Sequence, residues 1–293
     1  MWIEKFTGYL RYEKNRSSHT EISYLNDLRQ FQQFIESETG EFNPNTIDSD
    51  LIRMWIVHLI EQGLKATTAN RKLSTIKSFY TFLQRKQLVS VNPAACITGP
   101  RMEKKLPSFV KHSDMLEVLN PESFSDNFEG KRNLFLIELL YLTGMRREEL
   151  IGLKDEDVDQ FKKTLRILGK GNKERVIPFS DKTSELFSDY IRIRNKEIEN
   201  RTPYLFVRKN GKRMYPEMVY TIVNKHLSHV KTLSTKSPHV LRHSFATVML
   251  NSGAEINAIK DLLGHASLAS TQIYTHVTFK ELKEVYDNAH PRA

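Results

Sequence analysis

Histidine, arginine and tyrosine side chains recur near the end of this 293-residue chain at spacings that suit chemistry. His239 and Arg242 are three residues apart in a segment that is predicted to be a helix, so their side chains share one face. His265 and Tyr274 follow, nine residues apart. Each could be structural alone, as a capping histidine, a surface arginine or a packed tyrosine. Together, these residue types favour a site in which histidine transfers protons, arginine binds an anion and tyrosine acts as a nucleophile.

A zinc site formed by His239, His243 and His265 is the obvious alternative. The helix of a zinc protease needs an acidic residue between its two histidines, and none lies between His239 and His243. The chain has one cysteine, so no cysteine pair can complete a structural zinc site. We therefore predict no metal site.

A glycine-rich turn surrounds Lys170, in the sequence Gly169-Lys170-Gly171. The turn lacks the spacing of a phosphate-binding loop and lies between two predicted strands, residues 165–168 and 175–178, so nucleotide binding is not expected. A lysine at a hairpin tip can reach into a groove or a catalytic site. Taken alone, an ordinary exposed turn lysine is the simpler interpretation.

The elements that must position these residues divide the chain in two. Three prolines, Pro93, Pro100 and Pro107, fall close together and predict a linker. We expect a helical domain over residues 1–97, a linker over 98–108 and a second domain over 109–293. The predicted fold is mainly α, with a helical bundle followed by an α+β domain that contains a small antiparallel sheet.

Hydrophobic spacing predicts the individual helices. In the first domain, apolar residues recur at three to four positions over 22–35 and 51–59, and from Thr67 onward, giving a four-helix unit. Ile22, Met54 and Val57 belong to these apolar sets. In the second domain, an apolar helix over 131–143 stops at Gly144. Further helices are expected over residues 183–199, 216–229, 238–250, 255–263 and 279–288.

The net charge of +9 is unevenly distributed. Residues 1–61 contain six basic and ten acidic residues, whereas residues 62–99 contain six basic residues and no acidic one. The helix from Thr67 places Arg71 beside the small polar residues Ser74, Thr75 and Ser78. Such a face can approach a polyanion closely, although a solvated lysine-rich face explains the charge equally well.

Composition excludes several classes of protein. An apolar content within the usual range argues against disorder, and a single cysteine, Cys96, cannot form an internal disulfide. The sequence has no signal peptide and no apolar run of membrane-spanning length. We expect a soluble, cytoplasmic protein with no membrane partner.

Five motifs, which carry six candidate residues in order, resemble those of the tyrosine recombinases of the phage integrase family, and most resemble those of its Xer branch. Thr143-Gly144-Met145-Arg146 resembles the first arginine motif and Gly169-Lys170-Gly171 the hairpin lysine motif. His239 to Arg242, Leu263-Gly264-His265 and Tyr274-Thr275-His276-Val277 resemble the remaining boxes. The resemblance covers nearly the whole chain and implies six catalytic residues: Arg146, Lys170, His239, Arg242, His265 and Tyr274.

The resemblance also implies a role for each residue. Tyr274 is the nucleophile and forms a 3′-phosphotyrosyl bond, so that rejoining DNA requires no ATP. Arg146 and Arg242 bind the phosphate oxygens, Lys170 protonates the leaving 5′ oxygen, and His239 assists proton transfer at the tyrosine.

Two further roles complete the site that the resemblance implies. His265 hydrogen-bonds the phosphate, and Glu149 is a supporting acid that orients the site. Two fixed arginines supply the charge that a metal supplies in other nucleases, so the expected mechanism has neither metal nor cofactor.

The implied partner is double-stranded DNA that carries a specific recombination site. The first domain resembles the family's SAM-like core-binding domain. The two domains would clamp the duplex, and four protomers, identical or paralogous, would assemble on it. Leu282, Val285 and Tyr286 of the last helix would dock either on a neighbour or on their own domain. The expected DNA-binding residues are Lys65, Arg71, Lys72, Lys77, Arg101, Lys104 and Lys105.

Several functions remain open at this stage. The expected role is the resolution of chromosome dimers, and the sequence leaves open whether a DNA translocase activates it. Compact length favours this over a large phage integrase, but integration of a mobile element uses the same chemistry. A type IB topoisomerase shares the tyrosine chemistry, and a DNA-binding accessory factor without catalysis is the alternative from another class.

Overall fold

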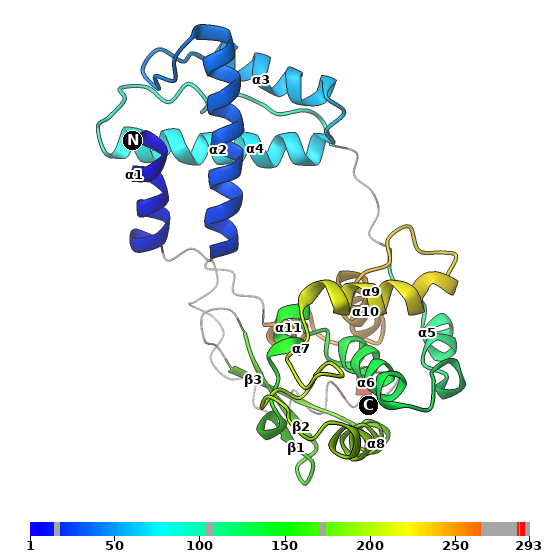
Figure 1. Ribbon diagram of the computed structural model, residues 1–293. Coiled ribbons are helices and arrows are strands. Elements are labelled where there is room, and N and C mark those ends of the chain that lie inside the picture. Colours follow the sequence, from blue (N-terminus) through cyan, green and yellow to red (C-terminus); the bar gives the residue numbers. More distant parts are fainter. Residues whose placement is uncertain (15–17, 103–107, 170–173, 265–285, 287, 291–293) are drawn as a thin grey trace. The chain divides into compact units, whose positions relative to one another are not determined.

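The computed structural model describes residues 1–14, 18–102, 108–169, 174–264, 286 and 288–290 (Figure 1). The chain divides into two compact units, Met1–Lys105 and Leu106–Ala293, each with its own hydrophobic core. We call them the N-terminal unit and the C-terminal unit. The predicted fold class is confirmed, because the chain is mainly helical and has one small antiparallel sheet. The domain limits at residues 97 and 109 stay a prediction.

The N-terminal unit is a small helical bundle in which α2 packs against α1, α3 and α4 (Figure 1). Asp48 caps α3, since its side chain accepts hydrogen bonds from the backbone N–H groups of Asp50 at 3.0 Å and Leu51 at 2.9 Å. The elements are α1 (Trp2–Gly8), the π-helix η1 (Tyr9–Glu13), α2 (Ser18–Thr39), α3 (Ser49–Glu61) and α4 (Ala66–Arg85).

The inward faces of these helices differ in part from the predicted ones. Helix α3 buries Ile52, Trp55, Ile56 and Leu59, a regular three-to-four spacing. Met54 and Val57, which the sequence analysis grouped with the buried set, are 49% and 55% exposed. Ile22 in α2 is likewise 55% exposed. Overlapping apolar spacings on one helix left the orientation of the buried stripe ambiguous.

The C-terminal unit surrounds the buried helix α6, against which α8 and α10 pack. Its helices are α5 (His112–Val118), α6 (Phe128–Thr143), α7 (Arg147–Gly152), α8 (Asp181–Glu197), α9 (Pro216–His226), α10 (Pro238–Asn251) and α11 (Ile256–Leu263). Short 3₁₀ turns complete it: η2 (Pro121–Ser123), η3 (Asp155–Asp157) and η4 (Leu227–His229).

One three-stranded antiparallel sheet lies beside these helices (Figure 1). Its strands are β1 (Val158–Asp159), β2 (Thr164–Leu168) and β3 (Glu174–Pro178), in the order β1-β2-β3. The predicted hairpin is confirmed, with Leu165 opposite Ile177 and Leu168 opposite Glu174. Strand β2 contacts α7 and β3 contacts α11, so the hairpin is held between these two helices.

The last described residues pack on the C-terminal unit itself. Tyr286 and Ala289 belong to its hydrophobic core. The ring of His290 stacks on Tyr286 and on Phe245 of α10, with ring centroids 5.2 Å and 5.6 Å apart. Of the three residues expected to dock, Tyr286 therefore packs within its own chain, whereas Leu282 and Val285 lie outside the described residues.

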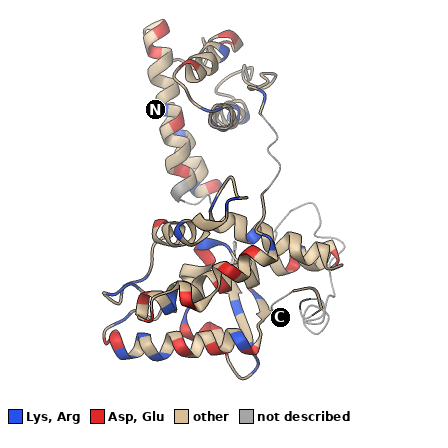
Figure 2. Cartoon of the chain, turned by 90° about the vertical axis from the view of Figure 1, so that its right-hand side faces the viewer, with Lys and Arg blue, Asp and Glu red and all other residues tan. Residues whose placement is uncertain are grey.

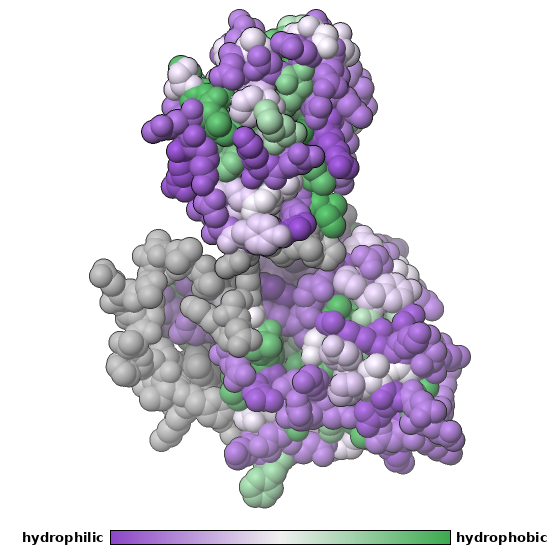
Figure 3. All heavy atoms as spheres, turned by 60° about the vertical axis from the view of Figure 1, so that its left-hand side comes forward, coloured by the Kyte–Doolittle hydropathy of each residue, from purple (hydrophilic) through white to green (hydrophobic). Residues whose placement is uncertain are grey.

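The surface is polar over both units. Figure 2 shows acidic and basic residues interspersed along the helices of each unit, and the face in Figure 3 is mostly hydrophilic with scattered apolar groups. Within the part of the chain that the structure describes, no helix has both the length and the apolar character needed to cross a bilayer.

Candidate active site

Glu149 and Arg146 form a tight pair at the start of α7. The backbone N–H of Arg146 donates to Oε2 of Glu149 at 2.8 Å, and Nη1 of Arg146 donates to Oε1 at 2.8 Å. Glu149 is buried, whereas the side chain of Arg146 is 36% exposed. The carboxylate therefore fixes both the backbone and the guanidinium group of Arg146, and leaves the guanidinium within reach of solvent.

A second arginine, Arg175 of β3, binds the same carboxylate. Its Nη1 donates to Oε1 of Glu149 at 3.1 Å and its Nη2 to Oε2 at 2.7 Å, which is the bidentate arrangement. From the sequence, Arg175 was expected only to be part of a strand. Arg175 and the buried Ile177 are two residues apart, so both side chains lie on the inward face of β3. This alternation along the strand is the signal that could have shown that Arg175 points inward.

Arg242 of α10 lies next to this pair and is held by backbone carbonyl groups. Its Nη1 donates to the carbonyl oxygen of Gly144 at 2.6 Å, and its Nη2 donates to that of Leu263 at 2.8 Å. Nη2 of Arg146 donates to the carbonyl oxygen of Gly264 at 3.4 Å. The ends of α6 and α11 thus hold the two candidate phosphate-binding arginines.

Gly144 must be glycine for this arrangement to form. It ends α6 in the left-handed conformation, with φ +57°, and a Cβ there would lie 2.7 Å from side-chain atoms of Leu263 and Phe245. The close approach lets the Gly144 carbonyl group reach Arg242. The predicted stop of the helix at Gly144 is confirmed, and the structure adds the reason for it.

We call Arg146, Glu149, Arg175 and Arg242 the arginine site. Burial of Glu149 by itself would raise its pKa, but hydrogen bonds from Arg175 and Arg146 outweigh burial, so its pKa lies below the ordinary value of 4.5. Burial, together with repulsion by Arg146 and Arg175, lowers the pKa of Arg242 to about 10, against the attraction of Glu149. Three cations around one carboxylate leave a positive site that an anion would neutralise.

The other predicted catalytic residues are placed only in part. His239 is in the first turn of α10, one turn before Arg242, and is exposed. Lys170, His265 and Tyr274 lie outside the described residues. Their described neighbours are informative, because Gly264, directly before His265, contacts the arginine site, and β3, directly after the Lys170 turn, carries Arg175.

The predicted DNA-binding residues fall into two groups. Lys65, Arg71 and Arg101 are exposed, and Lys77 is half-buried. Lys72 differs from the expectation, because it is buried and its Nζ donates to Asp27 at 3.0 Å. Lys104 and Lys105 lie outside the described residues.

Thr75 also points inward, and its hydroxyl donates to Asp27 at 3.0 Å. Lys72 and Thr75 are therefore not part of an outer face of α4. The sequence showed a cation and a small polar residue, but their partner Asp27 is 45 positions or more away along the chain.

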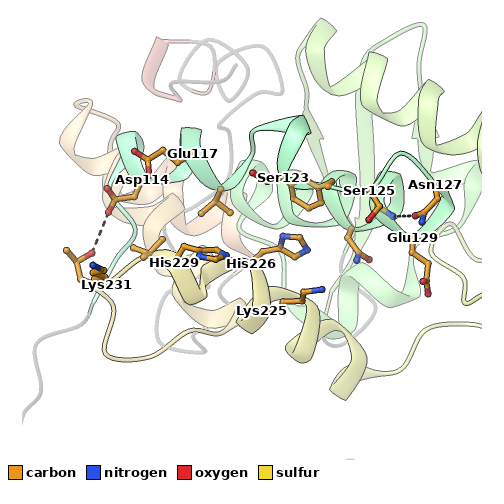
Figure 4. Close-up of a pocket in the computed structure, with 16 residues that line it drawn as sticks. Asp114, Glu117, Ser123, Ser125, Asn127, Glu129, Lys225, His226, His229 and Lys231 are labelled. Atoms are coloured by element: carbon orange, nitrogen blue, oxygen red, sulfur yellow. Dashed lines mark hydrogen bonds between the residues drawn. The ribbon is translucent and has the colours of Figure 1, made fainter.

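The C-terminal unit also contains a separate cavity of about 680 Å³ between α5 and the end of α9 (Figure 4). Its walls carry both charges, with Asp114 and Glu117 on α5 and Lys225 and His229 at the end of α9 and in η4 (Figure 4). Burial lowers the pKa of His226, with repulsion by Lys225 and His229 contributing. Of the predicted catalytic residues that the structure describes, Arg146, His239 and Arg242, none lines this cavity, and its mixed charge does not single out an anionic substrate.

Comparison with known proteins decides the family. Residues 111–281 match the phage integrase family, and residues 3–87 match the N-terminal SAM-like domain of phage integrases. The chain belongs to the phage integrase family. It is a tyrosine recombinase, an enzyme of site-specific DNA recombination, as the motifs predicted.

Phage integrase family members of known name match over the full length. The chain is 35% identical to the tyrosine recombinase XerC of Chlorobaculum parvum, over 100% of this chain and 95% of the relative. It is 38% identical to XerC of Pelobacter propionicus, over 99% and 95%. It is 33% identical to the tyrosine recombinase XerD of Staphylococcus epidermidis, over 99% of both chains.

Solved structures of phage integrase family members share the fold. The Tn1549 transposon integrase in complex with a circular intermediate DNA matches with TM-score 0.74 and 20% identity, over 98% of this chain and 99% of that chain. XerH bound to difH substrate matches with TM-score 0.70 and 23% identity, over 96% of this chain and 82% of that chain.

Proposed function

We propose that this tyrosine recombinase is a Xer-type enzyme that resolves chromosome dimers through a 3′-phosphotyrosyl bond at Tyr274. Full-length similarity to recombinases named XerC and XerD supports the Xer assignment. The arginine site supports the chemistry, because two fixed arginines can bind the non-bridging oxygens of a phosphodiester.

The arginine site would act on the scissile phosphate. Arg146 and Arg242 would each donate to the non-bridging oxygens, where negative charge increases in the transition state. Both guanidinium groups are already fixed, Arg146 by Glu149 and Arg242 by the Gly144 and Leu263 carbonyl groups, so little reorganisation is needed on binding DNA.

The cleavage step would transfer the phosphate from DNA to Tyr274. The phenol oxygen attacks phosphorus while the bond from phosphorus to the 5′ oxygen breaks. The phenol proton leaves with help from His239, and Lys170 gives a proton to the 5′ oxygen. His265 donates a hydrogen bond to the phosphate. Rejoining reverses these steps with a 5′ hydroxyl group of the partner strand, so the bond energy is conserved without ATP.

The exposed basic residues Lys65, Arg71 and Arg101 would contact the DNA backbone, together with Lys77, Lys104 and Lys105. Lys72 is left out of this set because its side chain is buried against Asp27, whereas Arg71, which also pairs with Asp27, is half exposed. Contacts of this kind release counterions, so binding would weaken steeply as salt rises. Four protomers, identical or paralogous, would act on two duplexes, each cutting one strand.

The test is to capture the DNA that the enzyme cuts. The chain is incubated with sheared DNA of its own host, covalent complexes are trapped with detergent, and the attached fragments are sequenced beside a Tyr274→Phe control. A single enriched chromosomal locus is expected. That locus then provides the recombination site for every later assay.

Other outcomes would contradict this proposal in distinct ways. Enrichment at the ends of a mobile element would indicate an integrase with the same chemistry. Relaxation of supercoiled plasmid without a preferred site would indicate a topoisomerase. Binding with no covalent capture, even after host extract has been added to supply a paralogue or a translocase, would indicate an accessory factor without catalysis.

A further inference from the structure

Arg175 occupies a central position in the arginine site although it is not one of the six motif residues. It lies in β3, five residues after Lys170, and its side chain is only 10% exposed. It binds Glu149 with both terminal nitrogens. Its Nε is buried and has no hydrogen-bond partner among the described residues. A cation so enclosed is costly to bury, so stability alone is a weak reason for it.

The hydrogen bonds of Glu149 show what Arg175 does. Each carboxylate oxygen accepts one bond from Arg175 and one from Arg146: Oε1 from the two Nη1 atoms, and Oε2 from Nη2 of Arg175 and the backbone N–H of Arg146. These four hydrogen bonds, two from each arginine, fix the orientation of the Glu149 carboxylate. If the two bonds from Arg175 were lost, Glu149 could rotate and Arg146 would lose its fixed position.

Arg175 also contacts the end of α11. A Cβ at Gly264 would lie 3.1 Å from Nη1 of Arg175, so the glycine lies directly against the guanidinium group. Gly264 has φ +62° and its carbonyl group accepts a bond from Arg146. One side chain thus joins the strand after the Lys170 turn, the helix after Arg146 and the residue before His265.

We propose that Arg175 is a positioning residue for DNA cleavage, which holds Arg146 through Glu149 and fixes the hairpin strand to the arginine site. This inference rests on the proposed function of that site. It differs from a purely electrostatic role, in which Arg175 would only add positive charge.

Two neutral substitutions separate positioning from charge. Arg175→Gln makes the site less positive, whereas Glu149→Gln makes it more positive. A charge effect on an anionic substrate therefore predicts opposite changes for the two variants, and positioning predicts a loss in both. Arg166→Gln is the matched control, because Arg166 lies in the neighbouring strand β2 and is exposed, and its Nε donates to Asp157 at 3.1 Å.

The first measurement is the rate of single-turnover covalent capture on the fragment that the wild-type enzyme captures. Arg175→Gln and Glu149→Gln are each expected to slow capture about 100-fold, because a small displacement of a catalytic group has an effect of that size. The double variant should be no slower than the slower single variant, since both act through one contact. Arg166→Gln should react at the wild-type rate.

The second measurement does not depend on DNA cleavage. Calorimetry with inorganic phosphate on the full chain is expected to show weaker binding in both variants, by about fivefold, the equivalent of one hydrogen bond. If the wild type captures no DNA, the proposed function fails, but the phosphate affinities of the wild type and the variants still test whether Arg175 positions Arg146. If the wild type captures DNA and Arg175→Gln does so at the same rate, the inference alone fails.

Three further results would overturn the inference: opposite changes in the two single variants, multiplied effects in the double variant, or an equal loss in Arg166→Gln. A melting curve checks that each variant folds. If Arg175→Gln does not fold, Arg175→Lys keeps the charge but cannot bind both carboxylate oxygens through a planar fork. It is expected to fold and still to cleave slowly, and wild-type cleavage by this variant would contradict positioning.

Discussion

Replacement of Asp27 by asparagine is expected to destabilise the N-terminal unit strongly. Asp27 is 2% exposed and accepts hydrogen bonds from Arg71, Lys72 and Thr75. Asparagine has the same shape but no charge, so the ammonium group of Lys72, whose side chain is 5% exposed, loses its counter-charge. Breaking a buried pair in this way costs about 3–5 kcal/mol of unfolding free energy. Arg71 is half exposed and remains hydrated, so it adds little.

Replacement of Lys72, the partner of Asp27, is expected to lower the unfolding free energy far less. In Lys72→Met, Asp27 keeps the bidentate bonds from Arg71 and the bond from Thr75. The charge-assisted bond to Asp27 that is lost contributes about 1.5–3 kcal/mol, and Gln30, which also accepts a bond from Lys72, is exposed and can bind water instead. Methionine keeps the buried apolar contacts of the lysine stem and removes the cost of burying an ammonium group, which offsets that loss. The two terms nearly cancel, and the change in unfolding free energy should stay within about 1 kcal/mol.

Urea unfolding of the full chain, followed by tryptophan fluorescence, measures both effects. The chain has two tryptophans, Trp2 and Trp55, and both lie in the N-terminal unit, with Trp55 only 1% exposed. The signal therefore reports on that unit within the intact protein. DNA affinity against salt concentration is measured in parallel, with exposed Lys65→Met as the comparison for Lys72→Met.

Lys72→Met should leave the salt dependence of DNA binding unchanged, whereas Lys65→Met should reduce its slope by about 1, the value for one phosphate contact. The reasoning would be refuted if Lys72→Met reduced the slope as much as Lys65→Met did. A loss below about 1 kcal/mol in Asp27→Asn would refute it as well.

Three further predictions concern the C-terminal unit. Gly144→Ala should lower the unfolding free energy by about 2–4 kcal/mol, because the added Cβ strains the backbone and overpacks the core. Gly253→Ala should lower it less, because Gly253 has φ +86° but open space around it. Equal losses in chemical denaturation would contradict this. Because the pKa of Glu149 is depressed, the stability that its ionised form contributes is present above pH 4.5 and is lost as the pH falls further. The melting temperature of Glu149→Gln should therefore change less than that of the wild type as the pH is lowered below 5. Parallel curves of melting temperature against pH would argue against this. Lys170→Ala should slow cleavage of ordinary DNA, and a 5′-thio leaving group, which needs no proton, should restore the rate; without rescue, Lys170 is not the general acid.

The sequence predicted the fold and much of the site because those features have local signals. The hairpin strands alternate, the α6 helix ends at a glycine, and the motifs of Arg146 and Arg242 lie in the order typical of the family. The spacing between Arg146 and Glu149 also allowed the contact that the structure shows.

The features that the sequence did not reveal depend on partners far apart in the chain. Arg175 meets Glu149 across 26 positions, and Lys72 meets Asp27 across 45. In both cases a charged residue occupies the inward face of its element, next to Ile177 in β3 and one turn from Ile76 in α4. Such a residue needs a buried counter-charge, but only the tertiary fold shows which one.

The most direct test of the central claim is to locate the covalent bond to DNA. After detergent trapping, nuclease and trypsin digestion would leave nucleotides on one peptide, and residues 261–280 form a tryptic peptide in which Tyr274 is the one tyrosine. Mass spectrometry should find the nucleotide adduct on Tyr274, with no adduct in Tyr274→Phe. An adduct on another residue, or one that persists in Tyr274→Phe, would contradict the account.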